Sequence, residues 1–380
     1  MAFKLSMVSL AIASTVISFA AAAQEVQVKI GHAGPISGGI AHIGKDNENG
    51  VRMAVEQLNA KGVMIGGKKA RFSLLAEDDA GDPKQATSVA QKLVDAKVSG
   101  VIGHVTSGAS IPASRIYNHA GIPEISAGTS HPKYTLQGFP VTFRVTANDG
   151  QLGAAVGRYA VEVSKAKKIA VIDDKTAYGQ GLANEFIKSA KAAGGDVVVR
   201  EHTTDKATDF AAVLTSVKAK KPDMIFFAGL ESTAGPMLRQ MKALGMNTKF
   251  MGGDAICTPN LPKFAGDSMA DEQVVCASAG GVPAEQKPAY DQWRADYKKR
   301  FGIETQLYAG QAYDATMTMV QAMQDAGSSE PAKYLPFLKK IHYRGISGDI
   351  SFDNNGDLNH APITLYTYRG GKIEALSVTK

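Results

Sequence analysis

Strand-like apolar segments alternate with segments of helical period along most of this chain, and the alternation occurs in two successive series. The first series begins near Val26, and the second begins after Asp149. Strands that alternate with helices form parallel sheets covered on both faces, so the pattern predicts an α/β fold with two units. The expected strands span residues 26–30, 72–76, 101–103 and 122–126 in the first series, and 169–173, 197–200, 224–227 and 250–251 in the second.

Helices are predicted where apolar residues recur every three to four positions. One of them follows Asp82 and Pro83, which suit the N-cap and the first helical position. After Cys276 the pattern is mostly helical, and short strands are expected on either side of the turn-forming segment 353–357. The other expected helices span 47–59, 111–119, 151–164, 181–193, 210–219, 236–244, 285–300, 311–326 and 332–341.

Composition excludes several classes of protein. A chain of 380 residues with 44% hydrophobic residues is not a disordered segment, and two cysteines cannot form the framework of a disulfide-built miniprotein. After residue 23, no apolar run approaches the roughly 18 residues that a membrane-spanning helix needs. The net charge is only +6, and the basic residues alternate with acids and small residues, which indicates solvated helix faces and no nucleic-acid partner.

Residues 1–23 have the pattern of a secretory signal peptide. Lys4 provides the positive start, residues 5–19 are mostly apolar, and Ala21-Ala22-Ala23 fits a cleavage site. The sequence therefore predicts an exported mature chain from Gln24 onward.

Export places Cys257 and Cys276, which are 19 positions apart, in an oxidising compartment. A disulfide between them would stabilise the fold by roughly 3 kcal/mol in the chain-entropy model. Two free buried thiols remain the alternative. Two cysteines without nearby histidines are too few ligands for a metal, so no metal site is predicted.

Known catalytic and cofactor motifs are missing from the sequence. There is no G-x-G-x-x-G or phosphate-binding G-x-x-x-x-G-K-[ST], no H-E-x-x-H and no G-x-S-x-G. His104 and His131 follow predicted strands and are expected to be structural, and Asp78, Asp79 and Asp82 are expected to form turns and helix caps. The sequence thus predicts a protein that is not an enzyme and has no cofactor.

Polar residues follow the predicted strands where ligands usually bind in open α/β sheets. Residues 104–110 and 127–130 are rich in hydroxyl groups and precede helices, which suits a carboxylate. Asp254 follows a predicted strand and two glycines, and it could accept hydrogen bonds from an ammonium group. Together these groups would suit an α-amino acid zwitterion, whereas ordinary helix capping is the alternative for each loop alone.

Several longer motifs resemble those of the periplasmic binding proteins for leucine, isoleucine and valine, over nearly the whole mature chain. These motifs are Val101–His104 through Ile111–Ser114, Asp82–Ala86, Asp174-Lys175 with Tyr178–Ala183, and Leu238–Gln240. The resemblance implies a type I periplasmic binding protein, in which two Rossmann-like lobes are joined by three crossing strands. The implied lobe 1 spans 24–147 plus 278–360, and lobe 2 spans 148–277 plus 361–380.

The implied function is the capture of an apolar, branched-chain L-amino acid in the periplasm and its delivery to an ABC-type permease in the inner membrane. The family generally acts as a monomer. A ligand-sensing receptor component of the same fold stays open as an alternative. An enzyme is a third and weaker alternative, because the sequence offers no nucleophile and base set.

The resemblance also implies a role for individual residues. Ser107 matches the serine that holds the ligand carboxylate, and Ser130 matches a threonine that contacts both carboxylate and ammonium. Asp254 matches a glutamate that binds the ammonium, and Tyr178 matches a tyrosine that closes over the ligand. The remaining implied contacts are backbone groups at Gly128 and the pocket-lining positions Val105, Thr106, Ile43 and Tyr308.

Three departures from the family pattern keep the specificity open. Leu230 replaces a tyrosine that contacts the ammonium, and Glu231 after it either points at the ligand or starts the next helix. Ile43 replaces another tyrosine, and the positions of a family disulfide are Ala80 and Thr106 here. An aromatic amino acid, or an amide, therefore remains an alternative ligand.

Overall fold

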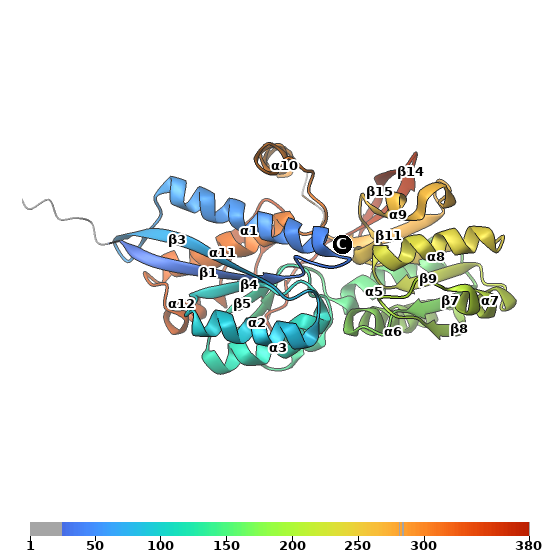
Figure 1. The fold of residues 1–380 in the computed structure, drawn as a ribbon, viewed down its shortest axis with the longest axis horizontal. Helices are drawn as coiled ribbons and strands as arrows, with labels where there is room; N and C mark the ends of the chain where they lie inside the picture. The colour runs from blue at the N-terminus through green and yellow to red at the C-terminus, as the bar shows by residue number, and fades with distance from the viewer. Residues whose placement is uncertain (1–24, 281, 283–284, 380) are drawn as a thin grey trace, which may run out of the picture.

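A computed structural model describes residues 25–280, 282 and 285–379, so the predicted signal peptide lies outside the described residues. The chain forms two lobes side by side, each built on one large sheet (Figure 1). The sheet of the first lobe has the strand order β2-β3-β1-β4-β5-β6, and all its pairs are parallel except β2 with β3. Its strands are β1 (Val26–Gly34), β2 (Met64–Ile65), β3 (Lys68–Asp78), β4 (Gly100–Gly103), β5 (Glu124–Ser126) and β6 (Thr142–Arg144).

Helices α1 (Ala41–Lys61), α2 (Pro83–Asp95), α3 (Ser107–Ala120) and α4 (Lys133–Leu136) connect these strands. The predicted start of α2 is confirmed, because Asp82 accepts a hydrogen bond from the backbone N–H of Gln85 and Pro83 is the first helical residue. The expected start of α1 at residue 47 is wrong by six residues. Its first two turns bury polar side chains, which hide the apolar period.

Three helices from later in the chain complete the first lobe, namely α10 (Lys287–Phe301), α11 (Ala309–Asp325) and α12 (Pro331–Leu338). Figure 1 shows α11 and α12 in orange beside the blue strands of the N-terminal segment. Met319 and Tyr334 share one buried cluster with Val28 and Ile30. A short hairpin of β12 (Tyr343–Arg344) and β13 (Asp349–Ile350) follows.

The sheet of the second lobe has the order β15-β14-β11-β10-β9-β7-β8. Its strands are β7 (Lys168–Asp173), β8 (Asp196–His202), β9 (Met224–Ala228), β10 (Lys249–Gly252), β11 (Val274–Ala279), β14 (Ile363–Arg369) and β15 (Lys372–Thr379). The expectation that residues 250–251 end this series is wrong. The sheet continues through β11 and through the antiparallel strands β14 and β15. β14 pairs with β11 across about 90 residues of sequence and forms a hairpin with β15.

The helices of the second lobe are α5 (Asp149–Arg158) with a π-helical extension (Tyr159–Val163), α6 (Ala177–Ala192), α7 (Ala211–Ala219), α8 (Glu231–Ala243), the short helix η2 (Asp254–Ile256) and α9 (Leu261–Ala265). Phe186 of α6 stacks on Phe226 of β9 with ring centroids 3.6 Å apart. A disulfide joins Cys257, just after η2, to Cys276 of β11. It ties the loop that carries Asp254 to the sheet.

The chain passes between the two lobes three times: from β6 to α5, from β11 to α10, and from the segment after β13 to β14. We call these three passages the hinge connections. Among the described helices, none is long and apolar enough to cross a membrane.

Candidate functional site

A buried carboxylate holds the two lobes together where they meet. Asp254 lies in η2, directly after β10 of the second lobe, and is only 1% exposed. Its Oδ1 accepts a hydrogen bond of 2.8 Å from the hydroxyl of Tyr178 at the start of α6. Its Oδ2 accepts one of 2.5 Å from the hydroxyl of Tyr308, which precedes α11 in the first lobe. Both phenols therefore orient one carboxylate between the lobes.

Burial dominates the electrostatics of this group. It raises the pKa of the Asp254 carboxyl, and the two phenol hydrogen bonds offset part of that rise. Burial and the Asp254 charge raise the pKa values of Tyr178 and Tyr308 well above the ordinary range, so both phenols stay neutral donors. A buried carboxylate with two neutral donors has a strong electrostatic preference for a cation beside it.

Hydroxyl groups lie at the ends of two strands of the first lobe. Thr106 precedes α3 but makes no side-chain cap, and its buried hydroxyl has no partner among the described residues. Ser107 is the first residue of α3, and its Oγ accepts a hydrogen bond from the backbone N–H of His131. The hydroxyl of Ser130, after β5, is also buried without a partner in the described part of the chain. Ordinary helix capping therefore does not explain Thr106.

Asp149 is a further candidate that the sequence did not single out. Both of its carboxylate oxygens are buried and lack a hydrogen-bond partner among the described side chains and backbone. Burial raises its pKa to about 8, the nearby Ser130 hydroxyl offsets part of the rise, and the charge of Asp254 adds to it. A Cβ placed on Gly181 would lie 2.7 Å from Asp149 Oδ2 and 2.6 Å from a carbon of His131. Asp149 therefore lies where Gly181 of the second lobe approaches His131 of the first.

A signal for Asp149 does exist in the sequence. Asn148 and Gln151 form a complete capping box at the start of α5. The acidic residue between them is therefore not needed as a cap. We call Thr106, Ser107, Ser130, Asp149, Tyr178, Asp254 and Tyr308 together the cleft site.

Apolar positions surround this polar set. A Cβ on Gly128 would lie 2.7 Å from the backbone oxygen of Val105 and 3.1 Å from the Tyr308 ring, so only glycine fits there. Val105, Tyr308 and Ile43 belong to one buried cluster of the first lobe. Leu230 packs against the second-lobe cluster that contains Tyr178. The structure thus brings Gly128, Val105 and Tyr308 close together, while the contacts of all these residues with a ligand stay predictions.

Glu231 starts the next helix, which is one of the two roles that the sequence left open, and a contact with the ligand stays a prediction. It is the first residue of α8, five positions before the expected start of that helix, and it is fully buried. Its Oε1 also forms an ion pair with Nε2 of His42, which lies in the first turn of α1 in the other lobe. Nearby, the Asn260 amide donates to the Gln306 side chain at 2.7 Å, which adds another contact between the lobes.

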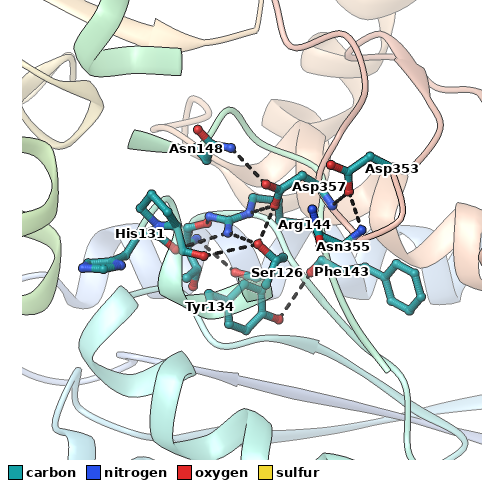
Figure 2. Close-up of polar contacts among 12 residues, drawn as sticks. Ser126, His131, Tyr134, Phe143, Arg144, Asn148, Asp353, Asn355 and Asp357 are labelled. Atoms are coloured by element: carbon teal, nitrogen blue, oxygen red, sulfur yellow. Dashed lines mark hydrogen bonds and ion pairs between the residues drawn. The ribbon is translucent and has the colours of Figure 1, made fainter. Parts of the chain in front are cut away.

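A buried arginine holds the Ser130 loop in place (Figure 2). Arg144 of β6 donates to the backbone oxygens of Thr129 at 2.9 Å and of His131 at 3.2 Å. Its Nε donates to Asp357 at 2.6 Å, and the other oxygen of Asp357 accepts a hydrogen bond from the Asn148 side chain at 2.9 Å. Arg144 therefore links the Ser130 loop to the start of α5 in the second lobe.

Two other groups highlighted by the sequence are structural. His104 is buried, with its Nδ1 2.6 Å from Asp79 and its Nε2 3.0 Å from the Tyr117 hydroxyl. Asp78 and Asp82 accept backbone N–H bonds in turns and at a helix start. Within the described residues, no group of three or more His, Cys, Asp or Glu side chains could hold a metal ion.

Two α/β lobes that meet over a buried, polar site define a two-lobed ligand-binding protein. The family model described as periplasmic binding protein matches residues 27–372. The chain belongs to this family, whose members bind substrates and are not enzymes, as the sequence predicted.

Individual relatives support this membership. An amino acid binding protein of Pseudomonas aeruginosa is 35% identical over 345 residues, which cover 90% of each chain. The Leu/Ile/Val-binding protein homolog 1 of Brucella abortus is 34% identical over 359 residues, which cover 94% of each chain. The branched-chain amino acid transporter substrate binding protein LivJ of Streptococcus pneumoniae, in complex with isoleucine, has a TM-score of 0.84 and 28% identity, and the match covers 93% of this chain and 99% of that one.

Proposed function

We propose that this protein captures an apolar L-amino acid between its two lobes and delivers it to an ABC-type permease. The observation that carries the proposal is Asp254, a buried carboxylate held by tyrosines from both lobes. An α-ammonium group is the cation that such a carboxylate would receive. The buried, unpartnered hydroxyls of Thr106 and Ser130 would receive the α-carboxylate, together with Ser107 and the N-terminal N–H groups of α3.

The apolar neighbours support an aliphatic side chain on the ligand. Ile43, Val105 and Leu230 would line the pocket, and none of them offers a hydrogen bond from its side chain. The B. abortus relative is named for leucine, isoleucine and valine, and the S. pneumoniae structure holds isoleucine. A branched-chain amino acid is therefore the ligand that we propose.

The same proposal includes the export, the location and the lobe boundaries of the protein. Residues 1–23 would be removed on export, and the mature chain from Gln24 would work as a monomer in the periplasm. The two lobes would comprise 24–147 plus 278–360 and 148–277 plus 361–380, and the hinge connections would let them open for the ligand.

Ligand-dependent stabilisation tests this proposal. The mature chain is unfolded and refolded to remove carried-over ligand, and its thermal unfolding is then measured with each of the twenty L-amino acids and with D-leucine. A ligand present at 100 times its dissociation constant adds about 2.7 kcal/mol to the free energy of unfolding. We expect leucine, isoleucine or valine to raise the melting temperature and D-leucine to have little effect.

A pair of matched variants locates the binding. Asp254→Asn should abolish the shift, whereas Asp267→Asn removes an exposed carboxylate of the same lobe and should preserve it. A melting temperature that no α-amino acid raises would contradict the proposal.

A further inference from the structure

A cavity lies at the hinge and not in the cleft. It encloses about 620 Å³, which is within the range of 300–1,000 Å³ that is usual for small-molecule sites. All three hinge connections line it, through residues 145–147, 279–280 and 361–363. None of the cleft-site residues lines it. The cavity is therefore a separate space, bounded by the segments that must bend when the lobes move.

The walls of this cavity are mostly apolar. Ala154 and Ala155 of α5 line it from the second lobe, and Ile350 and Leu358 line it from the first. Thr146 also lines the cavity, but its hydroxyl is buried away from the open space. The walls therefore offer a ligand mainly apolar contact.

One arginine on the lining is available to an anion. Arg158, at the end of α5, lines the cavity, is exposed and forms no ion pair with any described residue. Asp349 lines the cavity from the first lobe and keeps its negative charge, although its Oδ1 accepts a hydrogen bond of 3.0 Å from the side chain of Gln286. His360 adds a second potential donor at the rim. An arginine without a partner next to apolar walls is a suitable site for a carboxylate.

We propose that the hinge cavity binds a small aliphatic carboxylate, with its anionic group at Arg158 and its hydrocarbon part between Ala154 and Leu358. The bound molecule would contact both lobes and all three hinge connections. In the structure the lobes touch across the cleft through Tyr308 and Asp254. A molecule that fits the hinge in this arrangement favours closure and thereby raises the affinity for the amino acid in the cleft.

The first experiment measures binding at the hinge without any amino acid. Sodium hexanoate is titrated into the refolded mature chain and followed by calorimetry, and 1-hexanol serves as an uncharged molecule of the same length. We expect hexanoate to bind and hexanol to bind much more weakly. Arg158→Gln should weaken hexanoate binding by about ten-fold, the usual effect of losing a hydrogen bond to a charged group. Lys191→Gln, which removes an exposed cation from α6, should leave it unchanged.

Filling the cavity provides a second, independent arm. Ala154→Trp from the second lobe and Gln311→Trp from the first would each occupy the cavity, and each should abolish hexanoate binding. Two variants are used so that the test does not depend on the folding of one, and a thermal melt identifies which of them are folded. No binding of hexanoate at all, or binding that survives in every folded cavity-filling variant, would overturn the proposal.

The coupling between the two sites is tested last, and only this arm rests on the proposed function. Saturating hexanoate should tighten leucine binding about five-fold or more, and leucine should tighten hexanoate binding by the same factor. Competition between leucine and hexanoate would place hexanoate in the cleft and overturn the hinge site. If leucine does not bind but hexanoate binding still depends on Arg158, the proposed function fails and the hinge site stands.

Discussion

At the scale of single residues, Tyr178 and Tyr308 both donate to Asp254, but only the hydrogen bond of Tyr308 depends on the closure of the two lobes. Tyr178 belongs to the same lobe as Asp254, so its hydrogen bond persists when the lobes separate. Tyr308 belongs to the other lobe, so its hydrogen bond exists only when they meet. The Tyr178 phenol positions the carboxylate in either arrangement. The Tyr308 phenol positions it only when the lobes are closed.

We expect Tyr308→Phe to weaken amino acid binding by about 1.5–3 kcal/mol, the usual value for a hydrogen bond to a charged group. The loss would come from the closed state, because the phenylalanine ring still fills the same space but no longer donates to Asp254. Calorimetric titration with leucine measures it. Tyr366→Phe, which alters a half-buried phenol of β14 outside the cleft site, is the control. Equal affinities in Tyr308→Phe and the unaltered protein would show that this contact contributes nothing to binding.

The raised pKa of Asp149 predicts that the free energy of unfolding falls as the pH rises. Burial raises its pKa from 3.8 to about 8, so the folded protein holds this proton more tightly than the unfolded chain does. The contribution of Asp149 to the free energy of unfolding is therefore greatest below about pH 4, declines as the pH rises, and is lost above about pH 8.

Urea unfolding at a series of pH values between 4 and 9 tests this dependence. Asp149→Asn keeps the size of the side chain and has no titratable proton, so we expect its free energy of unfolding to decline less with pH. Asp267→Asn, at an exposed position, should follow the unaltered protein. Parallel curves for all three proteins would mean that Asp149 titrates normally.

At the scale of elements, Arg144 of β6 connects several segments near the site. Its guanidinium is buried and binds backbone oxygens of residues 129 and 131 as well as Asp357 (Figure 2). A lysine keeps the charge but cannot reach all these acceptors at once. Removing the partner of a buried charge usually costs about 3–5 kcal/mol.

Arg144→Lys should therefore lower the free energy of unfolding by a few kcal/mol and also weaken leucine binding, because the loop that carries Ser130 loses its anchor. Urea unfolding and calorimetric titration separate the two effects. Arg115→Lys, on the exposed face of α3, is the matched control and should change neither quantity much. Lower stability with unchanged leucine affinity would contradict the positioning role.

Local patterns predicted the elements whose signals are local. The cap of α2 at Asp82 and the hydroxyl groups after β4 and β5 could be found from sequence because caps and strand ends are encoded in a few neighbouring residues. The start of α1 could not be found in this way, because Asp46 is buried by contacts with residues far away in the sequence. Its carboxylate accepts backbone N–H groups of residues 306–309, about 260 positions away. The pairing of β11 with β14 was missed for the same reason.

The site residues also divide into those with a local sequence signal and those without one. Asp254 and Ser130 were predicted because they follow strands, where ligands bind in α/β sheets. Tyr308 precedes a helix, far from any strand end, and only the resemblance to a family pointed to it. Asp149 was missed because an acidic residue in the first turn of a helix is an ordinary helix signal.

At the scale of the whole molecule, hydrogen-bonded side-chain pairs bridge the cleft in the described part of the chain, and only a closed arrangement allows them. They include Tyr308 with Asp254, His42 with Glu231, and Asn260 with Gln306. The pair of His42 and Glu231 is the only ion pair between the lobes among the described residues. Neither residue belongs to the cleft site, so altering His42 changes closure without altering that set of side chains.

His42→Ala should shift the protein toward open forms. In a closed molecule the Glu231 carboxylate would then be buried without its partner, whereas in an open one water can reach it, so the cost falls on the closed state alone. Leucine affinity should fall about ten-fold or more, as when one partner of a buried pair is removed. Small-angle X-ray scattering of the ligand-free protein should show a larger radius of gyration. Glu231→Gln in the His42→Ala background should recover part of the affinity, since no unpaired charge remains. No recovery would mean that the loss has another cause than the buried charge.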